Sequence, residues 1–174
     1  YGDRDHRSMA DSVSEFYEAI RQTMARGGNV IIPAFALERT QELLFVLREG
    51  AASGDLPRSL NVFLDSPMAI TATQIYRRHP KDLKPKLAAH LAQGIDPFAL
   101  PNLHFVEEAA DSMALNGIRS GAVIMAGSGM CTGGRVRHHL RHNLGHADCS
   151  VIFVGFAAQG TLARIIIDGA NQVK

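Results

Sequence analysis

Five short apolar runs constrain the fold of this chain more than any other feature. They are rich in β-branched residues and occupy residues 29–35, 61–65, 103–108, 121–127 and 150–156. Nearly continuous hydrophobicity of this length is typical of strands that are buried on both faces, as in a parallel sheet. Segments with helical periodicity separate the runs. The alternation predicts an α/β fold, a three-layer sandwich with a mainly parallel sheet flanked by helices.

Two intervening segments show the clearest helical pattern. Residues 8–26 stop at Gly27-Gly28, and residues 38–49 stop at Gly50. Their predicted buried residues are Val13, Phe16, Tyr17, Ile20 and Met24 in the first helix and Leu43, Leu44 and Leu47 in the second. Residues 79–101 hold four of the seven prolines, which predicts an irregular excursion around a short helix, in the position of a lid or wall.

Composition limits the classes of protein that the chain can belong to. Its 174 residues are 46% hydrophobic, which fits one compact domain spanning residues 1–174. Eighteen basic and seventeen acidic side chains leave a formal charge of +1, so any basic surface must be local. With two cysteines, no signal peptide and no apolar run of membrane-spanning length, we expect a cytoplasmic location and no membrane partner.

The segments that follow the strands are the first place to look for a site, because open parallel sheets bind ligands beyond the carboxyl ends of their strands. Residues 33–35, 65–67, 127–130 and 155–156 should therefore share one edge. At Asp65-Ser66-Pro67, the first interpretation is a helix start, with Asp65 or Ser66 as the N-cap and Pro67 as the first helical residue. A role in a site is secondary there.

The most informative stretch is GSGMCTGGRVRHHLRHNL, residues 127–144. A glycine-rich loop between a buried strand and a helix lets the backbone approach a ligand and points helix amides at an anion. A tight turn that merely needs glycine explains the loop alone equally well. The helix shifts the balance toward a phosphodiester backbone, because it carries a dense basic face made of Arg135, Arg137, His138, Arg141 and His142.

Three other chemistries are considered for the same stretch. A dinucleotide site is disfavoured because the loop departs from G-x-G-x-x-G and follows the fourth strand. Cys131 and Arg137 have the C-x5-R spacing of cysteine phosphatases, although flanking residues differ and an unreactive thiol in a turn is the more common finding. His138 or His139 could pair with His142 on a metal, but no carboxylate joins them and nearby arginines would repel a cation.

Five ordered blocks of the sequence resemble one family closely. They are YGDRDHR at 1–7, IIPAFALERTQELL at 31–44, FLDSPMAI at 63–70, IMAGSGMCTGGRVRHHLRHNL at 124–144 and VIFVGFAAQGTLARIIIDGA at 151–170. The chain resembles the β-CASP domain of metallo-β-lactamase-fold RNA nucleases, the group that contains the cleavage and polyadenylation endonuclease. The resemblance is strongest to bacterial members and covers essentially all residues.

This resemblance implies that the chain is part of a longer zinc-dependent RNA hydrolase, an endoribonuclease with exoribonuclease activity as a second option. In such enzymes two zinc ions are held by an H-x-H-x-D-H motif and further ligands in the metallo-β-lactamase domain. None of those motifs is present here, and the chain begins at Tyr1 without an initiator methionine. The resemblance therefore implies an excised cap domain that is inactive alone, with no catalytic residue and no metal ligand of its own.

The implied partners are single-stranded RNA and the metallo-β-lactamase domain of the same polypeptide. The residues expected to contact RNA are Ser128, Gly129, Met130, Arg135 and His138, with Arg39, Arg164, Arg4 and His6 as further candidates. Two alternatives stay open at this point. They are a cysteine-dependent phosphatase that uses Cys131 and Arg137, and a non-catalytic interaction domain.

Overall fold

Five parallel strands form one sheet at the centre of the computed structural model, which describes residues 7–173. The strand order is β3-β2-β4-β1-β5, and every neighbouring pair is parallel. The bounds are Val30–Pro33 for β1, Asn61–Asp65 for β2, Leu103–Phe105 for β3, Ala122–Ala126 for β4 and Ser150–Val151 for β5. The predicted α/β sandwich with a parallel sheet is confirmed.

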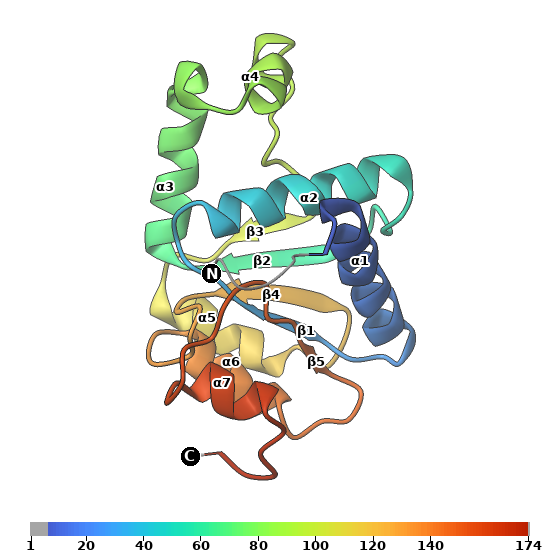
Figure 1. Ribbon diagram of the computed structural model, residues 1–174, viewed down its shortest axis with the longest axis vertical. Coiled ribbons are helices and arrows are strands. Elements are labelled where there is room, and N and C mark those ends of the chain that lie inside the picture. The colour runs from blue at the N-terminus through green and yellow to red at the C-terminus, as the bar shows by residue number, and fades with distance from the viewer. Residues whose placement is uncertain (1–6, 174) are drawn as a thin grey trace.

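Helices cover both faces of this sheet (Figure 1). One face carries α1 (Met9–Ala25), α2 (Arg39–Ser53) and α3 (Pro67–Arg78). The other face carries α6 (Val136–Asn143) and α7 (Leu162–Ile167), with α5 (Ala109–Ala114) and the 3-10 helix η2 (Leu115–Gly117) nearby. No helix in residues 7–173 combines the length and the apolar composition needed to cross a membrane.

Alternation along the central strands explains the two cores. Val30 and Ile32 of β1 pack with α1 and α2, whereas Ile31 packs with Val136 and Leu140 of α6. All three strand residues are fully buried, and burial of each such side chain contributes about 1.5–3 kcal/mol. Strands β1 and β4 are buried at every position and therefore need apolar residues throughout. This is why both are nearly continuous hydrophobic runs.

The edge strands and one helix end differ from the sequence prediction. The ladder of β5 stops at Val151, although Ile152 still donates to Ile31 O at 2.9 Å. Strand β3 likewise ends at Phe105 instead of residue 108. Helix α2 continues through Gly50, where a Cβ would lie 2.8 Å from the Tyr17 ring, and it is capped by the left-handed Gly54. Gly50 therefore allows close helix packing and does not stop the helix.

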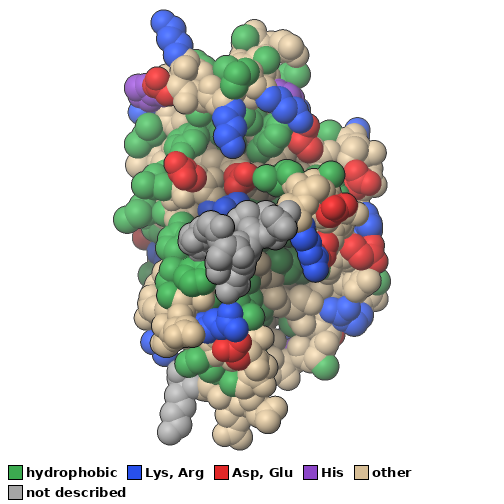
Figure 2. Space-filling model, in the orientation of Figure 1, with side chains coloured by type: hydrophobic (Ala, Val, Ile, Leu, Met, Phe, Trp, Pro, Cys, Tyr) green, Lys and Arg blue, Asp and Glu red, His purple; other side chains and the backbone are tan. Residues whose placement is uncertain are grey.

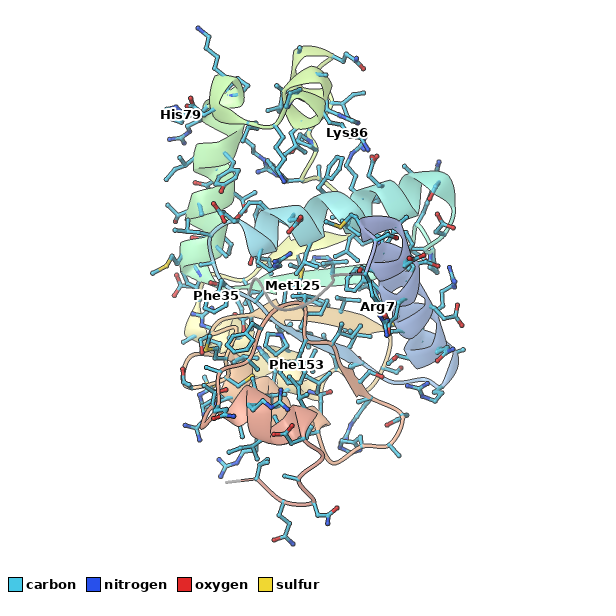
Figure 3. All side chains as sticks on the ribbon, in the orientation of Figure 1. Arg7, Phe35, His79, Lys86, Met125 and Phe153 are labelled. Atoms are coloured by element: carbon cyan, nitrogen blue, oxygen red, sulfur yellow. The ribbon has the colours of Figure 1, made fainter. Side chains whose placement is uncertain are left out.

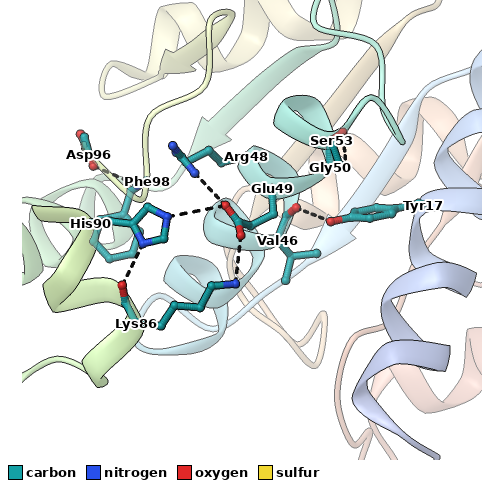
Figure 4. A network of polar contacts seen from close by, with 10 residues as sticks. All are labelled: Tyr17, Val46, Arg48, Glu49, Gly50, Ser53, Lys86, His90, Asp96 and Phe98. Carbon is teal, nitrogen blue, oxygen red and sulfur yellow. Dashed lines mark hydrogen bonds and ion pairs between the residues drawn. The ribbon is translucent and has the colours of Figure 1, made fainter. Parts of the chain in front are cut away.

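The excursion predicted at 79–101 contains η1 (Pro80–Asp82) and α4 (Pro85–Ala92), at the top of Figure 1. Figure 4 shows how it is attached to α2 through Glu49. Lys86 donates to Glu49 at 3.0 Å and stacks over Phe45, and the His90 ring packs edge-on against the same Phe45. Burial alone would raise the pKa of Glu49, but Lys86, Arg48 and His90 together lower it. The carboxylate therefore stays ionised and holds the excursion in place.

Candidate functional site

Three of the four segments predicted to share an edge line one small pocket at the carboxyl ends of the strands. The pocket has a volume of about 190 Å³ and is lined by Pro33, Ala34, Phe35, Arg39, Gly129, Met130, Val154, Gly155 and Phe156. We call it the edge pocket. Figure 3 shows Phe35 at the side toward which the strands run, beyond Met125 of β4. Residues 65–67 do not line it.

The loop between β4 and α6 has a backbone that specific glycines make possible. Gly134 has φ +77°, and a Cβ there would lie 2.4 Å from Gly127 O. A Cβ on Gly129 would lie 2.9 Å from the Phe35 ring, so the ring rests directly on the loop. Among the described residues, the two non-glycine residues with positive φ are Cys131 in this loop and Glu38 beside the pocket. Such backbone strain concentrates at functional sites.

The backbone donors of this loop differ from the expected arrangement. The first amides of α6 are already used, because Val136 N donates to Gly127 O at 3.0 Å and Arg137 N donates to Gly134 O at 3.3 Å. The first helix amides, which the sequence suggested for an anion, are therefore already bonded to the loop's own carbonyls. Within the described chain, the amides of Gly129 and Met130 have no acceptor. The free donors lie at the edge pocket.

A buried polar cluster fixes the start of α6. Asp65, fully buried at the end of β2, accepts from Arg135 Nη1 at 2.7 Å and from Ser112 Oγ at 2.6 Å. Its second oxygen also lies 2.6 Å from Nε2 of the buried His139. Burial would raise the pKa of the Asp65 carboxyl, but hydrogen bonds from His139, Ser112 and Arg135 hold it below its ordinary value. We call these four residues the Asp65 cluster.

Arg135 therefore has three protein partners in this structure. Besides Asp65, its guanidinium donates to Val106 O at 3.0 Å and to Glu107 O at 2.7 Å. It ties the end of β2 and the segment after β3 to the start of α6. Contact between Arg135 and RNA stays a prediction. Only the N–H groups of the guanidinium that are not bonded to Asp65, Val106 or Glu107 would be available to RNA.

The other predicted contact residues fall into three groups. Ser128, Gly129, Met130 and Arg39 lie at or beside the edge pocket, where Arg39 pairs with Glu42 at 2.5 Å and Ser128 Oγ accepts from Gly133 N. His138 is exposed on α6, without a side-chain partner among the described residues. Arg164 pairs with Asp168 on α7, away from the pocket lining. Arg4 and His6 lie outside the described residues.

Sequence reasoning missed the Asp65 cluster. It treated Asp65 and Ser66 as alternative caps of α3, and the structure shows that Ser66 is the cap, accepting from Ala69 N at 3.3 Å. It considered His139 as a metal ligand, disfavoured that role, and did not place the side chain in the core. One signal was available, because an aspartate at the end of a buried strand needs positive partners. The sequence could not identify which of the nearby basic residues supplied them.

Neither the cysteine-phosphatase interpretation nor the histidine metal-site interpretation of the α6 region fits the structure. Cys131 is fully buried in the core beneath α6, and burial raises the pKa of its thiol to about 11. A nucleophilic cysteine needs the opposite shift, so the phosphatase reading of Cys131 and Arg137 is wrong. His139 is committed to Asp65, and no three potential ligand side chains gather in residues 7–173 to hold a metal ion.

Large apolar side chains are exposed after the strand ends, with Phe35 in the edge pocket and Leu37 and Met68 in a separate hollow against α3. Phe35 is 48% exposed, Leu37 60% and Met68 69%, and each follows the end of a strand or begins the next helix. Figure 2 shows hydrophobic side chains gathered along the left of this face, at and below α3. Surface patches of this kind mark binding sites. The edge therefore combines apolar surface, unpaired backbone donors and an arginine.

Comparison with known proteins places the chain in a family. The Beta-Casp domain profile matches residues 40–166. The chain is 42% identical over 167 residues to ribonuclease TTHA0252 from Thermus thermophilus, a match that covers 96% of this chain and 38% of the relative. It is 32% identical over 157 residues to transcription termination factor FttA from Pyrococcus abyssi, covering 90% of this chain and 24% of that protein.

An RNase J-like protein from Methanocaldococcus jannaschii is 32% identical over 160 residues, covering 92% of this chain and 36% of the relative. The chain thus spans less than two fifths of the length of each of these three proteins. Both the profile match and the identities extend over most of the chain. The chain belongs to the Beta-Casp domain family.

Proposed function

We propose that the chain is the RNA-binding cap of an RNA hydrolase, an endoribonuclease with exoribonuclease activity as a second option. The observation that carries the proposal is the edge pocket, which brings an exposed aromatic ring, an arginine and two unpaired amides within one small hollow. Proteins grip single-stranded nucleic acid by combining backbone contacts of this kind with aromatic platforms. A family that includes a named ribonuclease supports the same function.

Each component has a distinct task in this proposal. The amides of Gly129 and Met130 donate to phosphate oxygens, and Arg39 supplies positive charge from α2 while it keeps its contact with Glu42. The exposed ring of Phe35 stacks with an unpaired base, and the Gly129 backbone supports the other side of that ring. The Asp65 cluster holds the loop end so that these donors keep their direction.

Hydrolysis itself is assigned to residues outside this chain. The family resemblance implies two zinc ions in a metallo-β-lactamase domain, which would supply an activated water. The described residues contain no cluster of three ligands that fits such an ion. The contribution of this chain is to bind and orient the strand.

Replacing Phe35 with alanine tests the proposal in the protein that carries this chain. Stacking of one base on an aromatic ring is worth about 1–3 kcal/mol, so we expect RNA affinity to fall by about fivefold or more, with hydrolysis falling in parallel at limiting RNA. Met113→Ala is the control, because Met113 is 66% exposed and does not line the edge pocket. Absence of RNA binding and hydrolysis by the unmodified protein would refute the proposal and favour a non-catalytic interaction domain.

A further inference from the structure

A second hollow lies on the other side of the β4–α6 loop, between α6 and the α7 end of the chain. It has a volume of about 870 Å³ and is lined by Gly134, Arg137, His138, Leu140, Arg141, Leu144, Gly145, Leu162, Ile166, Ala170, Asn171, Gln172 and Val173. We call it the α6–α7 groove. Figure 1 shows the two helices next to each other below the sheet. None of the residues that line this groove is acidic.

The sign of its charge distinguishes this groove from two hollows beside α1 and α2. Those hollows carry both signs with an acidic excess. One is lined by Glu15 and Glu42 with Arg39, and the other by Glu38, Glu42, Glu49 and Asp82 with Lys84 and Lys86. Among residues 7–173, the ionisable side chains that line the α6–α7 groove are those of Arg137, Arg141 and His138. A groove of one sign concentrates ligands of the opposite sign, so its natural occupant is an anion.

The two arginines of the groove are available for a ligand. Arg137 and Arg141 are exposed, and their guanidinium groups have no hydrogen-bond or ion-pair partner among the described residues. Most arginines elsewhere in the described chain are engaged, as Arg135 is by Asp65 and Arg164 by Asp168. The spacing of four residues places Arg137 and Arg141 on one face, about 6 Å apart along the helix axis. That separation is comparable to the spacing of neighbouring phosphates on an extended strand.

The opposite wall favours nucleic acid over an acidic peptide. It presents the apolar side chains of Leu162 and Ile166 together with the amide side chains of Asn171 and Gln172. Apolar surface can contact the faces of bases, and amide groups match the mixed donors and acceptors on base edges. Nucleotide bases match both features at once, because each base has an apolar face and a polar edge.

The groove and the edge pocket are lined by opposite ends of the same loop. Gly129 and Met130 line the edge pocket, and Gly134, at the other end of the same loop, lines the groove. Met130 O accepts from Ala163 N at 3.1 Å, which ties the start of α7 to this loop. A strand that leaves the edge pocket and passes over the loop therefore arrives at Arg137.

From these observations we propose that the α6–α7 groove binds the continuation of the single-stranded RNA held at the edge pocket, with Arg137 and Arg141 contacting successive phosphates. The inference rests on the proposed function and extends it with a second contact region for the same RNA strand. The RNA affinity should therefore depend on the length of the strand. A short strand fills the edge pocket alone, and a longer strand reaches both.

The test compares Arg137→Ala/Arg141→Ala with Arg58→Ala/Arg78→Ala in the protein that carries this chain. Arg58 and Arg78 are likewise exposed and without a described partner, so the control removes the same charge elsewhere. Binding of a labelled four-nucleotide RNA and a labelled twenty-nucleotide RNA is measured by fluorescence anisotropy over a range of salt concentrations. Thermal unfolding of each variant verifies that the fold is retained.

We expect the groove variant to bind the long RNA about tenfold more weakly and to bind the short RNA as the unmodified protein does. For the long RNA, the slope of the logarithm of the binding constant against the logarithm of the salt concentration should decrease in magnitude by about 1.4. Each of the two lost phosphate contacts on a single strand contributes about 0.7 to this slope. Equal affinities of the groove variant and the control variant would overturn the groove proposal and leave the edge pocket standing. Displacement of the long RNA by polyglutamate at equal charge concentration would overturn the assignment to RNA.

If the unmodified protein binds neither RNA at low salt, the proposed function fails along with the groove. If it binds both with equal affinity, the path through the groove fails alone. The two proposals are therefore distinguishable in a single set of titrations.

Discussion

The two faces of α6 use the same types of side chain in opposite ways. On the inner side, Arg135 and His139 converge on Asp65, which is fully buried. On the outer side, Arg137 and Arg141 are exposed and unpaired within the described chain. Position relative to the sheet, and not residue type, separates the basic residues that hold the fold from those that are free to meet a ligand.

The energetic consequences of this difference are large. Removing one partner of a buried ion pair costs about 3–5 kcal/mol, because the other charge stays buried without compensation. An exposed arginine without a partner contributes little to stability, and changes at such positions are usually within about 0.5 kcal/mol. Substitutions on the two faces should therefore give different signatures, which the following predictions use.

The largest effect is expected from Asp65→Ala. The substitution leaves Arg135 and His139 without their shared acceptor, and we expect the free energy of unfolding to fall by about 3 kcal/mol or more. Urea unfolding followed by circular dichroism measures the change. The exposed Asp111 provides the control as Asp111→Asn, and a loss below about 1 kcal/mol for Asp65→Ala would contradict a stabilising role for the cluster.

Gly134→Ala should come second. An alanine in the left-handed region costs about 1–2 kcal/mol, and its Cβ would also lie 2.4 Å from Gly127 O. The neighbouring Gly133 is a matched control in the same loop, because it lacks a positive φ and a Cβ there meets nothing within 4 Å. If Gly133→Ala and Gly134→Ala destabilised the protein equally in thermal unfolding, the described loop geometry would be wrong.

The contribution of Asp65 should depend on pH in a defined direction. Because the folded protein lowers the pKa of Asp65, its stabilisation is present above the ordinary aspartate pKa of about 3.9 and is lost as pH falls through the folded value. The difference in stability between the unmodified protein and Asp65→Asn should thus be constant near neutral pH and shrink below about pH 4. A difference that grew on acidification would have the wrong sign.

The smallest effect on stability is expected from Arg137→Ala/Arg141→Ala. Both side chains are exposed and lack described partners, so we expect a change within about 0.5 kcal/mol. Arg135→Ala, only two residues from Arg137, should cost several times more because it leaves the buried Asp65 carboxylate without its arginine. Equal losses for the two faces, measured in the same urea titrations, would remove the distinction drawn between them.

The sequence was sufficient to predict the sheet and its layers. The runs at β1, β2 and β4 are buried on both faces, so their hydrophobicity has a single explanation. The edge strands were less predictable, because residues 152–154 pack against both cores as an apolar run without forming a ladder. The prediction that the second helix ends at Gly50 was wrong, because glycine allows close packing of helices as well as helix termination.

The candidate site was predicted in part. Glycine spacing located the loop and its edge, since glycine tolerates conformations that other residues do not. The pairing of Asp65 with Arg135 joins residues 70 positions apart, and nothing in the local sequence indicates which of the six basic residues in 135–142 turn inward. The same limit applies to the amides of Val136 and Arg137, whose acceptors depend on how the loop folds back.

The central claim is that RNA meets the carboxyl edge and the outer face of α6, while the inner face holds the structure together. Hydrogen exchange of the protein with and without a twenty-nucleotide RNA tests it most directly. The account predicts slower exchange at Gly129 and Met130 and along residues 170–173, with little change in α1 and α4. Slower exchange confined to α1, α2 or α4, with the loop unchanged, would contradict the account.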